Sequence, residues 1–415
     1  NLLMQPPVHH KVVIGLDPGY RTGCKVGVVD ATGKVLDTGV IYVTHSQSQK
    51  ESAARYIKEL IQKYQVDLIS IGNGTASKET EMFVAELLKT MPGAKTRYII
   101  TNEAGASVYS ASKLGAEEFP DFDVTRRSAI SIARRVQDPL AELVKIEPKA
   151  IGVGQYQHDM NQKRLSETLG GVVEDAVNSV GVDLNTASAP LLTYISGISG
   201  ALAKNIVAYR EGEGAFQSRS QLKKVPKLGP KAYEQCAGFL RIKDGKNILD
   251  NTSVHPESYP AAKELLEKLG YTLEDVSAGN LGDLKKSAQK YGLEKLADEL
   301  KIGVPTLEDI LNELTKPGRD PRDEVEQPLL RSDVMSMEDL TEGMILTGTV
   351  RNVIDFGAFV DIGVHQDGLV HISQLSDSYV KHPMDVVSIG DIVRVKVLEV
   401  DPQKKRISLT MKGLA

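Results

Sequence analysis

Five short runs of alternating apolar and polar residues near the end of the chain constrain its fold most strongly. They lie at about 344–352, 357–362, 367–372, 391–400 and 406–411. In a β-strand, alternation of this kind points one set of side chains inward and the other outward. A longer, partly helical connection separates the third run from the fourth. The number and spacing of the runs predict a small five-stranded OB barrel over 342–415.

The same alternation predicts that aromatic and basic side chains lie on the outside of this barrel. Phe359 alternates with the aliphatic residues beside it and shares a face with Asp361, although only 5% of the chain is aromatic. The other outward residues are His371, Arg394, Lys396 and Arg406, with Phe356 just before the strand. Unpaired bases stack on aromatic rings for about 1–3 kcal/mol each, while cations follow the phosphates. We therefore predict an RNA-binding face; the alternative is that another part of the chain covers Phe359 and the cations only keep the barrel soluble.

Composition narrows the class of protein. A chain of 415 residues is long enough for several domains. Its two cysteines, Cys24 and Cys236, are far apart and predict a reducing compartment rather than a disulfide framework. No apolar run approaches the roughly 20 residues that span a bilayer. We expect a cytoplasmic protein without a membrane partner.

Charge is distributed unevenly along the chain. The net charge is −5, yet 185–242 holds eight Lys/Arg against three Asp/Glu, and 306–341 holds four against ten. A basic segment within an acidic chain indicates a polyanionic partner, although a solvated charged surface would show the same count.

Residues 11–150 predict an α/β domain. Three short apolar runs separated by Gly-rich turns indicate an antiparallel meander, and helix and strand then alternate through a helix at 47–64, a strand in "DLISIG", a helix capped by Ser77 and a strand in "TRYII". This order of elements is that of a ribonuclease-H-like fold.

Three carboxylates in this domain are candidates for catalysis and for metal binding. Asp17 ends the first strand, where ribonuclease-H-like nucleases place an aspartate on a divalent metal, and Glu103 and Asp138 could complete the set. Mg²⁺ or Mn²⁺ would be needed only for such a nuclease. Each residue also has a structural alternative: turn amides for Asp17, the start of a helix for Glu103, and an N-cap before a proline for Asp138. Asn73 stands where resolvase-type nucleases carry an acid.

A second interpretation of the Asp17 loop is a phosphate loop like that of actin-like ATPases. That superfamily needs a duplicated α/β domain with a second Asp-Gly loop, and we find no second copy in the sequence.

Residues 151–242 are predicted to be mostly helical, with two similar hairpins in 185–242. The candidate phosphate-binding residues are Gly197, Ile198, Gly200 and Lys204 in the first hairpin, and Lys227, Gly229 and Lys231 in the second. A helix start offers unpaired N–H groups and the positive end of the helix dipole to a phosphate. The pair resembles a tandem helix-hairpin-helix, although Lys227 replaces the usual glycine; Gly-containing turns that only pack helices are the alternative.

The remaining boundaries follow from composition. Residues 1–10 are predicted to be a tail, and 243–341 a helical connector that ends in an acidic linker.

The barrel segment "GTVRNVIDFGAFVDIG…DGLVHISQLS…GDIVRVKVLEVDPQKKRISLTMK" resembles an S1-type RNA-binding domain. The resemblance implies an RNA face made of Phe356, Phe359, His371, Asp401 and Arg406. With "IGLDPGYRTGCK", "TNEAGASVYSAS", "RRSAISIARRVQDPLAELVKI" and "GVGQYQHDM", the whole chain resembles the bacterial Tex transcription accessory proteins, which have a YqgF-like ribonuclease-H domain.

This resemblance implies a cytoplasmic scaffold that binds nucleic acid and modulates transcription. The expected ligand is single-stranded RNA, with DNA as a further possibility, and the transcription or translation machinery is the expected protein partner. We expect a monomer that needs no cofactor for binding. Family members are longer at the N-terminus, so we expect this chain to be a piece of a longer protein. A metal-dependent nuclease is the alternative function.

Overall fold

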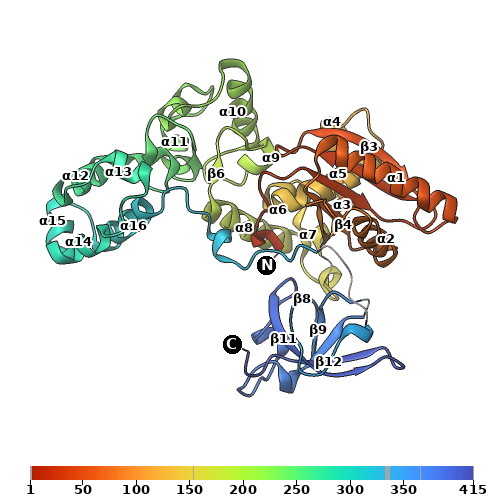
Figure 1. Ribbon diagram of the computed structural model, residues 1–415. Helices are drawn as coiled ribbons and strands as arrows, with labels where there is room; N and C mark the ends of the chain where they lie inside the picture. Colours follow the sequence, from red (N-terminus) through yellow and green to blue (C-terminus); the bar gives the residue numbers. More distant parts are fainter. Residues whose placement is uncertain (1, 153, 332–336, 365, 415) are drawn as a thin grey trace. The chain divides into compact units, whose positions relative to one another are not determined.

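The computed structural model describes residues 2–152, 154–331, 337–364 and 366–414. The chain divides into two compact units, Asn1–Val153 with Val325–Ala415, and Gly154–Glu324. The first unit contains an α/β domain and a β-barrel, and the second is mainly helical (Figure 1).

The α/β domain is built on one mixed sheet of five strands in the order β3-β2-β1-β4-β5. The first three strands are antiparallel neighbours, and β4 and β5 continue the sheet in parallel with β1. The predicted meander followed by alternating elements is confirmed. The strands are β1 Val13–Asp17, β2 Cys24–Val29, β3 Val35–Ile41, β4 Leu68–Gly72 and β5 Arg97–Thr101.

Helices pack on both faces of this sheet. α1 (Gln47–Tyr64) begins with a capping box between Ser46 and Gln49, and α2 (Ser77–Lys89) follows β4. Ala76, in a left-handed conformation, precedes α2 and Ser77 is its first residue, so the predicted Ser77 cap is wrong. The other helices are α3 Ala106–Ala111, α4 Lys113–Glu118, α5 Val124–Gln137, α6 Pro139–Leu143 and α7 Pro148–Ile151.

Helix α5 lies unusually close to the first two strands. A Cβ atom on Gly15 would lie 2.1 Å from the carbonyl oxygen of Ala129, and one on Gly27 would lie 3.0 Å from the amide nitrogen of Ile130. Only glycine permits this approach, which brings the side chains of α5 to the ends of the strands.

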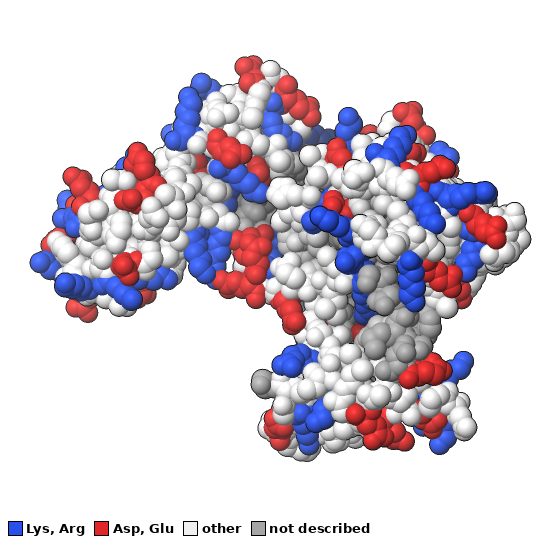
Figure 2. Space-filling model, in the orientation of Figure 1, with Lys and Arg blue, Asp and Glu red and all other residues white. Residues whose placement is uncertain are grey.

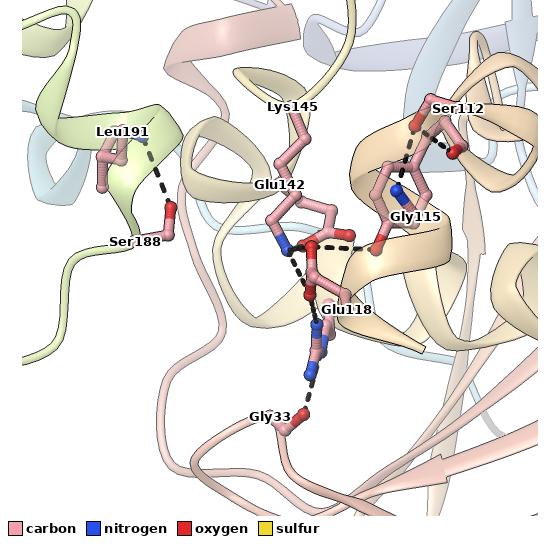
Figure 3. Close-up of polar contacts among 10 residues, drawn as sticks. Gly33, Ser112, Gly115, Glu118, Glu142, Lys145, Ser188 and Leu191 are labelled. Carbon is pink, nitrogen blue, oxygen red and sulfur yellow. Dashed lines mark hydrogen bonds and ion pairs between the residues drawn. The ribbon is translucent and has the colours of Figure 1, made fainter. Parts of the chain in front are cut away.

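A buried ion network joins α4, α5 and α6. The Glu118 carboxylate lies 2.9 Å from Arg134 and 3.0 Å from Lys145, and Lys145 lies 3.0 Å from Glu142 (Figure 3). Tyr109 donates its hydroxyl hydrogen to Glu118 at 3.0 Å. Burial alone would raise the pKa of Glu118, but Lys145 and Arg134 outweigh it and hold that pKa below its ordinary value.

The predicted tail at the start of the chain is packed instead. Leu2 and Leu3 contact the small core of Tyr109, Leu143 and Ile146. The Val8 amide also donates to the carbonyl of Val136 at 2.9 Å. Apolar residues before the first strand therefore belong to the α/β domain.

The C-terminal domain is a closed barrel with the strand order β10-β12-β11-β8-β9. Its inner side chains, among them Ala358, Val360, Val370, Val395 and Leu409, are buried as alternation predicted. The predicted five-stranded barrel is confirmed. The strands are β8 Ile345–Ile354, β9 Gly357–Asp361, β10 Gly368–His371, β11 Ile392–Asp401 and β12 Arg406–Thr410.

The second unit is a helical array with one short parallel ladder between β6 (Val182–Asp183) and β7 (Leu240–Arg241). Its N-terminal helices are α8 Gln162–Val180, α9 Ala189–Leu192, α10 Gly200–Glu213 and α11 Pro230–Cys236. A separate core of leucines holds together α12 Tyr259–Leu269, α13 Leu273–Ala278, α14 Leu284–Tyr291, α15 Leu293–Leu300 and α16 Val304–Thr315. None of the described helices is both long and apolar enough to cross a membrane.

Arg219 is a buried centre of this second unit. Only 1% of its surface is exposed, and its guanidinium donates to the carbonyls of Leu240 at 2.8 Å and Val254 at 2.7 Å. It also donates to the carbonyl of Thr252 and to the hydroxyl of Tyr259. This cation of the basic segment 185–242 therefore serves the fold and cannot meet a polyanion.

Candidate nucleic-acid interface

The aromatic residues predicted on the barrel lie close together. Phe359 of β9 pairs with Leu369 of β10, and Gly357 pairs with His371. Phe359 and His371 are thus diagonal neighbours on one face, at about 7–8 Å between Cα atoms. The carbonyl of Phe356 accepts from the Ile372 amide at 2.8 Å, which holds Phe356 beside them.

These rings are not part of the barrel core. Phe356 is 52% exposed, and Phe359 is partly exposed. His371 accepts a hydrogen bond at Nδ1 from the Ser373 amide at 3.3 Å, and its Nδ1 lies 2.9 Å from the Ser373 hydroxyl, which fixes the plane of the imidazole. We call Phe356, Phe359 and His371 the aromatic face.

Asp401 ends β11 and Arg406 begins β12, the strand that pairs with β10 of the aromatic face. They pair with each other across the β11–β12 turn, and Ser408, two residues beyond Arg406, pairs with Leu369. Arg406 is exposed. Asp401 accepts from the Lys404 amide at 3.0 Å, so it caps this turn.

Arg394 and Lys396 lie elsewhere on the barrel. They pair with Thr347 and Ile345 on β8, whereas Phe359 pairs with Asn352 of the same strand. Five residues along a strand span about 17 Å. The strand register therefore separates these cations from the aromatic face, where alternation alone had placed all of them on one outer surface.

The position of Asp361 also differs from the one that alternation predicted. It was expected on the wet side with Phe359, yet only 4% of it is exposed. Arg331 lies 3.2 Å from its carboxylate, and Arg351 donates through Nε at 3.1 Å. Burial alone would raise the pKa of Asp361, but the two guanidinium groups outweigh it and lower that pKa. Arg331 itself forms an antiparallel bridge with Tyr98 of β5.

The first hairpin has the geometry that its sequence predicts. The Ile198 amide donates to the carbonyl of Ile195 at 3.1 Å, Gly197 has φ +81°, and Ile198 is buried. Helix α10 begins at Gly200, and Lys204 lies exposed in its second turn. The hairpin is thus anchored by one apolar side chain while its backbone turn faces outward.

The second hairpin repeats this turn with a different residue at the strained position. The Leu228 amide donates to the carbonyl of Val225 at 3.2 Å, and Leu228 is buried. Lys227 has φ +65°, the left-handed conformation that Gly197 adopts in the first copy. This conformation costs a residue with a Cβ about 1–2 kcal/mol. Gly229 and Lys231 are exposed around Pro230, the first residue of α11.

Charge is mixed over the rest of the surface in view. Figure 2 shows Lys/Arg and Asp/Glu side chains interspersed on that face rather than gathered into one field. Local sites, and not the net charge of −5, must therefore provide any attraction to a polyanion.

In the α/β domain the structure brings two of the three candidate carboxylates near each other. The charge of Asp17 raises the pKa of Glu103, after burial, which is the larger cause. Burial also raises the pKa of Asp17, opposed by a hydrogen bond from Ser128 and by the charge of Lys25. Asn73 fixes the backbone of Glu103, because its Oδ1 accepts from the Glu103 amide at 3.1 Å.

Each of these two carboxylates interacts electrostatically with a cation that the sequence analysis missed, but the effect of burial on its pKa is larger. Lys25, largely buried, is the cross-strand partner of Asp17. Arg135 is 3% exposed, donates to the carbonyls of Asn102 and Ala104, and interacts electrostatically with Glu103. Burial lowers the pKa of Arg135 to about 10. Two features of the sequence could have revealed these cations: a lysine within an apolar strand and an arginine on the apolar face of a helix.

Asp138 has the capping role that was the alternative to catalysis. It is the N-cap of α6 and accepts from the Ala141 amide at 3.2 Å, directly before Pro139. Among the described residues, no three His, Cys, Asp or Glu side chains come together as a metal site. The two neighbouring carboxylates, Asp17 and Glu103, are fewer than the several converging carboxylates that two-metal chemistry uses.

Comparison with known families agrees with this architecture. The Tex protein YqgF-like domain matches residues 11–137, the helix-hairpin-helix motif 177–241, the HHH domain 247–322 and the S1 RNA binding domain 339–412. The chain is 54% identical to the transcriptional accessory protein Tex of Neisseria gonorrhoeae over 99% of its own length and 53% of that protein. It belongs to the Tex family.

Other relatives also match almost the whole of this chain. An uncharacterized protein of Bacillus subtilis, YdcI, is 58% identical over 99% of this chain and 56% of its own length. The human S1 RNA-binding domain-containing protein 1 is 40% identical over 99% of this chain and 47% of its own length. The chain spans about half the length of the curated relatives it matches.

Proposed function

We propose that this chain is the nucleic-acid-binding part of a transcription accessory scaffold, and that its main ligand is single-stranded RNA. The aromatic face carries this proposal. Phe359 and His371 lie on two adjacent strands, Phe356 lies in the turn before the first of them, and half of the Phe356 surface is left to solvent. Stacking on such rings selects unpaired bases without selecting their sequence.

The two hairpins supply a second, weaker contact. Lys204, Lys227 and Lys231 are exposed beside the two turns, so they can neutralise phosphates of RNA or of DNA. A strand that engages both the barrel and the hairpins is held by two linked sites, which raises affinity without a new type of contact.

The cellular setting that we propose is the transcription machinery. The relative named a transcriptional accessory protein supports this role. We further propose a monomer in the cytoplasm that needs no cofactor for binding. A nuclease is the less favoured function, because Asp138 caps a helix and the pair that interacts among the three candidates is Asp17 with Glu103.

Replacement of the exposed rings tests the proposal. The double variant Phe356→Ala/Phe359→Ala should lose more than about tenfold in affinity for a 12-nucleotide oligouridine, measured by fluorescence anisotropy. Ile389→Ala is a matched control, since Ile389 is an apolar barrel residue that is also 52% exposed. Unchanged affinity in the double variant, or an equal loss in the control, would remove the aromatic face from RNA binding.

A further inference from the structure

A cavity of about 660 Å³ lies beside the second hairpin. Its wall is formed by Lys223, Leu228, Tyr233, Glu234, His255 and Glu257. The volume falls in the range of small-ligand sites, about 300–1,000 Å³. The cavity spans residues on both sides of the boundary between the two helical motifs, at 241 and 247.

The walls of this cavity are held in place by polar contacts. Nε2 of His255 lies 2.8 Å from the carbonyl of Glu234, and Nδ1 accepts from the Glu257 amide at 3.2 Å. Nε2 thus faces a hydrogen-bond acceptor and Nδ1 a donor, and the imidazole ties the two walls together. Arg219 donates hydrogen bonds to the carbonyls of Leu249, Thr252 and Val254. Because Arg219 and Lys223 lie in the same short helical turn, these bonds fix that turn to the segment before His255. The site is therefore preformed.

The chemistry of the lining favours a flat, uncharged ligand. The Lys223 ammonium lies over the Tyr233 ring, 4.8 Å from its centroid. Because the lysine side chain is flexible, it can move away and leave this ring face to a ligand. One lysine stands against two glutamates, Glu234 and Glu257, and this balance disfavours a phosphate inside the cavity. A nucleobase is neutral and flat, and the carboxylates accept hydrogen bonds from its N–H groups.

We propose that this cavity, the base pocket, binds one unpaired nucleobase of a bound strand and prefers guanine. Guanine presents N1–H and the N2 amino group side by side, two donors for one carboxylate, whereas uracil presents a single N–H between two carbonyls. The base stacks on Tyr233 in place of the Lys223 ammonium, which moves to a neighbouring phosphate. The pocket thus adds base selectivity to a strand held by the aromatic face, and in this respect it rests on the proposed function.

Affinities of the full chain for two oligonucleotides test the base pocket. The probes are a 12-nucleotide oligouridine and the same oligonucleotide with one central guanine. The wild type should bind the guanine probe at least about fivefold more tightly, as expected for two good hydrogen bonds to a base edge. Tyr233→Leu, and separately Glu234→Gln/Glu257→Gln, should abolish this preference and leave oligouridine affinity unchanged. Glu234 and Glu257 are exposed, so we expect Glu234→Gln/Glu257→Gln to fold. This variant therefore tests the base pocket even if Tyr233→Leu fails to fold.

Other outcomes distinguish the two proposals. Phe356→Ala/Phe359→Ala should weaken both probes by the same factor, which tests the aromatic face alone. A guanine preference that is absent in the wild type, or that persists in both pocket variants, would overturn the base pocket. An arginine-rich hexapeptide that binds the wild type but not the glutamate variant, without any guanine preference, would also overturn it and indicate a basic protein partner.

A crosslink locates the base if overall affinity is too weak to compare. An oligonucleotide with one 6-thioguanosine should crosslink to the peptide that contains Tyr233, and Glu234→Gln/Glu257→Gln should abolish that crosslink. A crosslink found only on the barrel would contradict the base pocket.

Discussion

The α/β domain and the barrel differ in how far they expose the side chains that could bind a ligand. In the α/β domain Asp17 and Glu103 lie at the strand ends typical of a nuclease, but both are partly buried, and burial raises both of their pKa values. On the barrel, Phe356 and Phe359 remain at least partly exposed. A residue type at a family position therefore indicates a ligand most directly when the fold leaves that residue exposed to solvent.

This contrast predicts that substitutions in the two regions have separable effects. Changes at the buried site around Asp17 and Glu103 should alter stability without altering RNA binding. Changes at the aromatic face should alter RNA binding with little effect on stability.

Arg135→Leu should produce the largest change in stability. It removes the hydrogen bonds to the carbonyls of Asn102 and Ala104 and should lower the free energy of unfolding of the α/β domain by about 3 kcal/mol in a denaturant titration. Lys113→Met is the control, because Lys113 pairs with Glu117 at an exposed site and should cost less than about 1 kcal/mol. Weaker RNA binding by folded Arg135→Leu protein would break the proposed separation.

Removal of the hairpin cations should have an intermediate effect, on binding alone. Lys204→Gln/Lys227→Gln/Lys231→Gln should reduce the slope of log affinity against log salt by about 0.7 for each phosphate that is no longer neutralised. Lys113→Gln, on the α/β domain, serves as the single-charge control. An unaltered salt slope in the triple variant would leave the hairpins without a role in RNA binding.

The smallest effect concerns the pH dependence of stability. The pKa of Glu103 is raised in the folded chain by burial and by Asp17, so its ionised form destabilises the fold. Its contribution is fully favourable below the ordinary pKa of about 4.3 and is lost as pH rises through the folded value. Glu103→Gln should therefore gain stability over the wild type as pH rises above about 4.3, and lose that advantage in acid. The opposite trend would mean that Glu103 is ionised at a net gain, as in a charged catalytic site.

The two regions also differ in how far the sequence predicted them. Alternation is a local pattern, so it predicted the barrel and the outward placement of Phe356 and Phe359. The burial of Asp361 depends on Arg331, thirty residues away, and no local pattern could show it. The pairing of Lys25 with Asp17, the buried position of Arg135 and the separation of Arg394 from the aromatic face likewise depend on strand register and helix packing.

Selective labelling of phenylalanine tests the central claim most directly. The chain contains seven phenylalanines, so ¹³C labelling of their rings gives a small set of NMR signals. On titration with oligouridine, the signals of Phe356 and Phe359, assigned by substitution, should shift or broaden. The signals of Phe83, Phe119, Phe122, Phe216 and Phe239, all outside the barrel, should stay in place. If the oligonucleotide binds and the two barrel signals do not respond, the aromatic face is not where this chain holds RNA.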